Sequence, residues 1–154
     1  MNPRDSRRAL QIAIAVAGLV PVGAGLAGIL IGPAFAGLGA HGILSAAGVS
    51  LDSHFRYLSG LLLAIGLLFW RAIPTIERRG MLVRALTLIV VVGGLGRALS
   101  LLELGPPDDG MRFGLVMELV VTPLVCLWQR RVELQAEGRI QPLSTFFHPL
   151  SRLS

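Results

Sequence analysis

The chain has 154 residues, of which 53% are hydrophobic and only 15% are charged, and its formal net charge is +5. A soluble domain usually carries about a quarter charged residues, so this composition argues against a water-soluble fold. All of the positive charge is arginine, placed at the ends of apolar blocks, which argues against nucleic-acid binding and favours contact with lipid headgroups.

Four apolar blocks are long enough to cross a membrane as helices. They run from about Leu10 to Ile31, from Phe55 to Trp70, from Leu82 to Leu102 and from Phe113 to Trp128. A helix rises about 1.5 Å per residue and must cover roughly 30 Å of hydrocarbon, so we expect the short second and fourth blocks to extend by a turn. The sequence predicts an all-α, integral membrane four-helix bundle over residues 1–131, followed by a cytoplasmic or interfacial tail at 132–154.

The arginines predict the orientation of these spans, because cytoplasmic loops carry an excess of basic residues. One side would hold Arg4, Arg7, Arg8, Arg71, Arg78, Arg79, Arg84, Arg130, Arg131, Arg139 and Arg152. The other side would keep Arg56, Arg97 and Arg112, together with Glu103, Asp108 and Asp109. We therefore expect both termini in the cytoplasm and the loops at 32–51 and 103–112 on the outer side.

Small residues indicate where helices approach one another. The first span has a row of Ala24, Gly28 and Gly32, the second has Gly60, and the third has Gly93 and Gly96. Such rows let helix backbones pack closely, either within the bundle or at a homodimer face. Pro21 inside the first span is expected to kink it, because proline removes a backbone hydrogen bond.

Two opposite charges lie at similar depths in the third and fourth spans. Arg97 and Glu118 are each about one and a half turns from the outer end of their span. An isolated charge at that depth costs roughly 2.5–3.5 kcal/mol, and pairing a guanidinium with a carboxylate relieves this cost. We predict an Arg97–Glu118 ion pair facing the bundle interior, with Ser100 on the same face of its helix as Arg97.

The second span opens with another polar group. Asp52 and Arg56 are four residues apart on one helix face, which favours a pair, and Ser59 continues this face while His54 points the other way. In one interpretation Asp52 caps the helix, and Arg56 and Tyr57 anchor it at the headgroups. In the other, both residues line a polar pocket, open to the outer side, with the charged pair of the third and fourth spans. The candidate ligand-binding or structural cluster is Asp52, His54, Arg56, Ser59, Arg97, Ser100 and Glu118.

Motifs of catalysis are absent from the sequence. His41, His54 and His148 lack the spacing of metal ligands, and no nucleophile motif or phosphate-binding glycine loop is found. A single cysteine, Cys126, excludes an internal disulfide. We therefore expect no metal and no cofactor, and an enzymatic role is disfavoured.

Several of these residues form a recognisable pattern. The run from Asp52 to Gly60 (DSHFRYLSG), then Gly93 to Arg97 (GGLGR), and then Gly105-Pro106 before Glu118 resemble a bacterial inner-membrane family known as domain of unknown function 4345. The resemblance covers about Leu10 to Trp128. It implies a four-helix membrane fold, distantly similar to the small proteins grouped with DoxX, and localisation in the bacterial inner membrane. It implies no catalytic role.

Two functional hypotheses follow. In the first, the chain is an accessory subunit or a binder of a lipid-like ligand, with a polar pocket in the outer half of the membrane. In the second, it is a small oligomeric transporter or channel for an anion or protons. The expected partners are membrane lipids and, in addition, a larger membrane complex or further copies of the chain.

Overall fold

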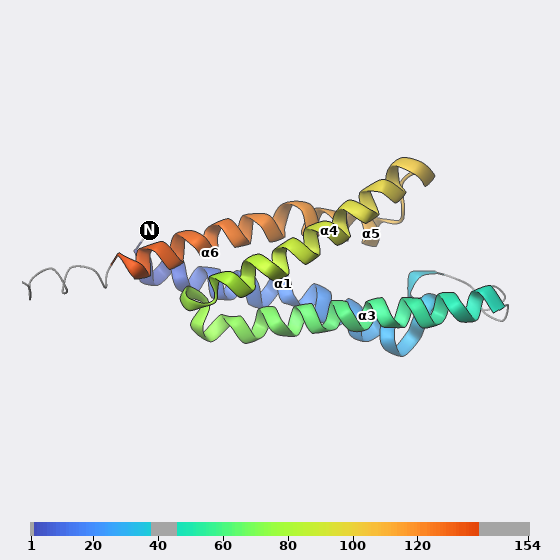
Figure 1. Cartoon of the computed structure of the whole chain (residues 1–154), viewed down its shortest axis with the longest axis horizontal. Helices are drawn as coiled ribbons and strands as arrows, with labels where there is room; N and C mark the ends of the chain where they lie inside the picture. Colours follow the sequence, from blue (N-terminus) through green and yellow to red (C-terminus); the bar gives the residue numbers. More distant parts are fainter. Residues whose placement is uncertain (1, 38–45, 139–154) are drawn as a thin grey trace, which may run out of the picture. The chain divides into compact units, whose positions relative to one another are not determined.

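The computed structural model describes residues 2–37 and 46–138, and every regular element in these ranges is a helix (Figure 1). In chain order the elements are α1 (Pro3–Ile31), η1 (Gly32–Ala36), α3 (Ala46–Ala72), η2 (Ile73–Arg78), α4 (Gly80–Leu104), α5 (Asp109–Val116), η3 (Met117–Val121) and α6 (Thr122–Glu137). The predicted all-α class is confirmed for this part of the chain. His41, Arg139, His148, Arg152 and the predicted tail beyond residue 138 lie outside the described residues.

Four stretches of the described chain are long and apolar enough to cross a membrane: Pro3–Ala36, Ala47–Arg78, Gly80–Leu104 and Asp109–Glu137. Each extends beyond the apolar block that predicted it, because a helix continues into polar flanking residues while its backbone stays hydrogen-bonded. In the most apolar 18-residue segment of each of these four stretches, taken in chain order, only 22%, 28%, 17% and 0% of the residues are buried. Leu30 and Leu104, for example, are 70% and 86% exposed. Such extensive exposed apolar surface indicates contact with something other than water.

The turn between α4 and α5 is short, and its residues explain both helix ends. Gly105 adopts a φ of 92°, which glycine tolerates, and Pro106 and Pro107 cannot continue the helical hydrogen bonds. Asp108 then starts α5, because its carboxylate accepts a hydrogen bond of 3.0 Å from the backbone N–H of Met111. The third and fourth spans are therefore antiparallel neighbours.

The contacts within the chain form two compact units. Unit 1 comprises Met1–Gln11 and Pro74–Ser154, and unit 2 comprises Ile12–Ile73. In unit 1, α4 packs against the continuous helix formed by α5, η3 and α6 (Figure 1). In unit 2, α1 packs against α3. The first turns of α1 belong to unit 1 and the rest of this helix belongs to unit 2.

The α1–α3 contact in unit 2 is made by direct approach of the two backbones. A Cβ on Gly25 would lie 2.6 Å from the backbone nitrogen of Leu63. Near one end of the contact, the indole N–H of Trp70 donates to the carbonyl of Ala15 at 3.1 Å. Near the other end, Arg56 reaches the last carbonyls of α1. The two helices are therefore antiparallel and packed through a glycine, as small-residue rows permit.

The predicted glycine row of the first span is correct at two of its three positions. Gly28 and Gly32 are both buried against side chains of α3. Gly25, rather than Ala24, makes the closest backbone approach. Neighbouring helical residues point about 100° apart, so a shift of one position decides which of them faces the partner helix.

A similar shift occurs in α4. A Cβ on Gly93 or Gly96 would meet no described atom within 4 Å, whereas a Cβ on Gly94 would lie 2.8 Å from Cδ2 of Leu119. Gly94 thus takes the packing position that the sequence predicts for Gly93 and Gly96. In α3, a Cβ on Gly60 would reach only Cδ1 of Ile29, at 4.0 Å, which is ordinary van der Waals contact.

Candidate functional site

The predicted ion pair between Arg97 and Glu118 is present in unit 1. Nε of Arg97, on α4, lies 3.3 Å from Oε1 of Glu118, on η3. The Glu118 side chain is 16% exposed and the Arg97 side chain is 40% exposed. The guanidinium also covers Gly114, where a Cβ would lie 3.2 Å from its Nη1. The carboxylate is therefore held within the helix contact, while the guanidinium extends to its edge.

Glu118 lies in an unusually wide helical turn. The η3 segment is a π-helix, in which backbone hydrogen bonds reach five residues back. The carbonyl of Met117 accepts from both the backbone N–H and the hydroxyl of Thr122, the latter at 2.8 Å. Pro123 accounts for this distortion, because it has no N–H to donate and its ring clashes with the carbonyl four residues earlier. Single π turns are frequent at functional sites, which marks Glu118 as a candidate.

The pair leaves hydrogen-bonding capacity unused. Nη1 of Arg97 contacts Sδ of Met111 at 3.2 Å, and a thioether is a weak acceptor. Among the described residues, the buried Oε2 of Glu118 has no hydrogen-bond partner. Guanidinium N–H groups arranged in this way can bind an oxyanion. Ser100, which the sequence assigns to this site, is exposed on α4.

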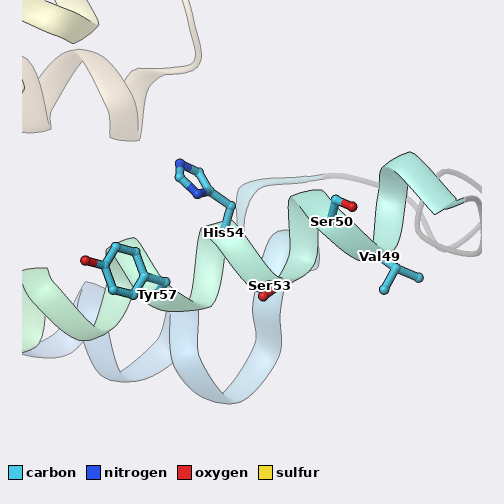
Figure 2. Close-up of a pocket in the computed structure, with 5 residues that line it drawn as sticks. All are labelled: Val49, Ser50, Ser53, His54 and Tyr57. Carbon is cyan, nitrogen blue, oxygen red and sulfur yellow. The ribbon is translucent and has the colours of Figure 1, made fainter.

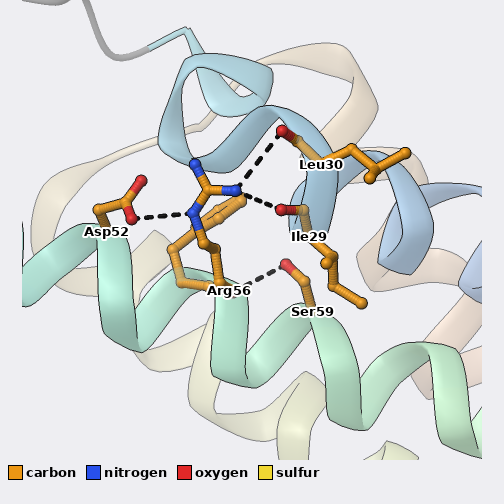
Figure 3. Close-up of polar contacts among 6 residues, drawn as sticks. Ile29, Leu30, Asp52, Arg56 and Ser59 are labelled. Atoms are coloured by element: carbon orange, nitrogen blue, oxygen red, sulfur yellow. Dashed lines mark hydrogen bonds and ion pairs between the residues drawn. The ribbon is translucent and has the colours of Figure 1, made fainter.

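Asp52 and Arg56 form the second predicted pair, in unit 2 (Figure 3). Nε of Arg56 lies 2.8 Å from Oδ2 of Asp52. Its Nη1 donates to the carbonyl of Ile29 and, at 3.5 Å, to that of Leu30. These carbonyls belong to the last turn of α1, which carries the negative end of the helix dipole. The pair therefore fastens the end of α1 to α3.

The interpretation that Asp52 caps its helix is wrong. The structure has α3 starting at Ala46, so Asp52 lies more than one turn inside the helix. Ser59 is also engaged locally, because its buried hydroxyl donates to the carbonyl of Phe55 at 2.8 Å. The polar face of α3 thus serves the α1–α3 contact.

The two charged pairs lie in different units of the chain. Asp52 and Arg56 belong to unit 2, whereas Arg97 and Glu118 belong to unit 1. The common pocket for all four residues stays a prediction.

His54 lies on another face of α3, as the sequence predicts. It is exposed and lines a shallow hollow with Val49, Ser50, Ser53 and Tyr57 (Figure 2). The ring centroids of His54 and Tyr57 are 6.4 Å apart, with planes inclined by 34°. All five residues come from α3, so the hollow is a surface feature of a single helix.

A polar cluster that the sequence analysis missed lies in unit 1, at the end of α4 opposite to Arg97. Its contacts are Arg7–Glu77 at 3.0 Å, Arg84–Glu133 at 3.1 Å, Trp128 to the hydroxyl of Ser6 at 3.1 Å, and Gln129 to the carbonyl of Ile76 at 3.0 Å. Gln129 is fully buried. The available signal was the pair of opposite charges at Arg84 and Glu133, each near the arginine-rich end of its apolar block. Neutral residues such as Ser6 and Gln129 give no such signal.

Over residues 2–37 and 46–138 the protein is thus all-helical, with four helices long and apolar enough to cross a membrane and with a cross-helix ion pair beside a π turn. Residues 9–129 match the family model described as Domain of unknown function (DUF4345), and the chain belongs to this family. This confirms the resemblance seen in the sequence, whereas the relation to DoxX stays a prediction. The chain matches no curated protein and no solved structure.

Proposed function

We propose that the chain is a multi-pass protein of the bacterial inner membrane, with both termini in the cytoplasm, that binds an anionic group in the headgroup of a lipid-like ligand at Arg97. The orientation is supported by the charge distribution in unit 1. One end of the unit carries the exposed residues Arg4, Arg8, Arg78, Arg79, Arg130 and Arg131, and the other carries Glu103, Asp108 and Asp109. On the positive-inside rule the arginine-rich end is cytoplasmic, so Arg97 and Glu118 lie in the outer half of the membrane.

The orientation predicts which positions react with a reagent outside the cell. In a chain whose only cysteine has been removed by Cys126→Ser, we expect Asp109→Cys to be labelled by a membrane-impermeant maleimide in intact spheroplasts. Arg78→Cys should be labelled only after the membrane is permeabilised. Labelling of Arg78→Cys in intact spheroplasts would contradict the proposed topology.

The exposed edge of the Arg97 guanidinium is the observation that carries the ligand proposal. Glu118 holds Nε, while the Nη groups face a weak acceptor and the surface of unit 1. Apolar side chains of α4 and α5, the helices that flank the pair, are also exposed, for example Leu102 at 81%, Phe113 at 55% and Val116 at 53%. A ligand with an oxyanion for the arginine and hydrocarbon chains for this surface satisfies both features.

Lipid retention tests this proposal. In purified protein analysed by native mass spectrometry, we expect Arg97→Gln to reduce the retained phospholipid at least about tenfold, because the charge-assisted hydrogen bonds to its phosphate are lost. Arg112→Gln is the matched control. It removes the same charge at the same end of unit 1, but Arg112 pairs with Asp109 of its own helix and lies outside the site. Equal lipid retention by the two variants would contradict the proposal.

A further inference from the structure

The second carboxylate oxygen of Glu118, Oε2, needs a hydrogen-bond donor, and Arg97 donates no hydrogen bond to it. Oε1 faces Nε of Arg97 at 3.3 Å, but Oε2 is buried with no hydrogen-bond partner among the described residues. A carboxylate oxygen only accepts hydrogen bonds, and a buried acceptor without a donor is strongly unfavourable. Unpaired groups of this kind are rare in folded proteins and call for an explanation such as an absent partner.

A bound phosphate would take the place of the Met111 sulfur as the hydrogen-bond acceptor of Arg97. Met111 contacts Nη1 of Arg97 through its sulfur at 3.2 Å, and its side chain is unbranched and adaptable. A phosphate at this position would replace a weak acceptor by a strong one. Both oxygens of the Glu118 carboxylate share one carbon, so a donor that reaches Oε2 lies next to a phosphate bound at Arg97.

We propose that the Arg97–Glu118 site selects phosphate esters that carry an N–H or O–H donor close to the phosphate, such as phosphoethanolamine or phosphoglycerol headgroups. The phosphate binds the Nη edge of Arg97, and the donor binds Oε2 of Glu118. The proposal rests on the proposed function, and it adds the chemical class of the headgroup. A headgroup without a donor leaves Oε2 unpaired and binds less tightly.

Two pairs of lipids with equal charge test the donor requirement. Phosphatidylethanolamine has N–H donors that phosphatidylcholine lacks, and phosphatidylglycerol has hydroxyls that phosphatidylmethanol lacks. With matched acyl chains, we expect the wild-type chain to bind the donor-bearing lipid of each pair at least about fivefold more tightly in native mass spectrometry titrations. In Glu118→Leu, both ratios should fall to about one, because the acceptor is gone.

The outcomes separate this inference from the proposed function. Wild-type ratios near one in both pairs, with binding that still depends on Arg97, would overturn the donor requirement and leave the proposed function intact. The wild-type ratios decide this point even if Glu118→Leu does not fold. Binding of none of the four lipids would overturn both proposals.

A competition experiment with soluble phosphoethanolamine distinguishes a lipid ligand from a soluble ester that carries the same headgroup. Failure of the soluble ester to displace bound phosphatidylethanolamine supports a lipid as the ligand. Displacement at low concentration would support the headgroup chemistry but contradict the lipid-like ligand of the proposed function.

Discussion

Replacing Gly25 by alanine is expected to lower the melting temperature of the purified chain, whereas replacing Gly23 by alanine is expected to leave it unchanged or raise it. A Cβ on Gly25 would lie 2.6 Å from the backbone nitrogen and 2.9 Å from the Cα of Leu63, and 2.8 Å from the carbonyl oxygen of Ser59. These are backbone atoms, which cannot rotate away. The α1 and α3 backbones would have to separate, with a cost of about 1–3 kcal/mol or more for overpacking.

Gly23 is the matched control on the same helix. A Cβ at this position would meet no described atom within 4 Å, so the substitution adds no clash. Alanine is favoured over glycine in a helix by about 1 kcal/mol, which can only help α1. Thermal unfolding followed by far-UV circular dichroism in one detergent would measure both effects. Equal melting temperatures for the two variants would show that the Gly25 contact does not hold the helices together.

Breaking the Arg97–Glu118 pair from one side is expected to destabilise the chain more than removing both charges. A lone charge among apolar helices within the membrane costs roughly 2.5–3.5 kcal/mol, and a buried charge that loses its partner is similarly unfavourable. We therefore expect Arg97→Met and Glu118→Leu each to lower the unfolding free energy by about 2–3 kcal/mol. The double variant should recover part of this loss, with a coupling energy of about 1–3 kcal/mol.

Arg112 and Asp109 form a comparison pair for this cycle. They lie on one helix, with side chains that are 56% and 91% exposed. Exposed pairs of this kind contribute about 0.2–1 kcal/mol, so the same cycle should show a small coupling energy. Unfolding free energies from denaturant titration in mixed micelles would provide both values. A coupling energy for the Arg97–Glu118 pair no larger than that of the exposed pair would show that the two charges do not depend on each other.

The Arg97–Glu118 contact could be predicted because the short connection between the two helices leaves few ways to arrange them. The turn before Asp108 is short, so the two helices must be antiparallel neighbours, and residues equally far from that turn lie at the same level. Two opposite charges at one level in an apolar environment then attract each other strongly. The role of Arg56 could not be predicted in the same way. Its guanidinium binds carbonyls of Ile29 and Leu30, and backbone acceptors give no signal in the sequence.

The glycine contacts show where sequence reasoning loses precision. The rows of small residues predicted that α1 and α4 pack closely against their partners, which the structure bears out at Gly25 and Gly94. They did not predict these particular positions, because each step along a helix turns the side chain by about 100°. The rotation of a helix is decided by the packing of all its side chains against the partner. Likewise, the start of α3 at Ala46 removed the capping role considered for Asp52.

By itself the sequence determined the all-helical class, the four apolar helices and the pairing of Arg97 with Glu118. These depend on hydropathy summed over long segments and on the few positions where a charge interrupts them. Only the tertiary structure decided that Gly25 and Gly94 make the close contacts, that Arg56 holds the end of α1, and that Oε2 of Glu118 has no partner among the described residues. The physical reason is that these features depend on helix rotation and on the reach of individual side chains, which differ between neighbouring residues of equal hydropathy.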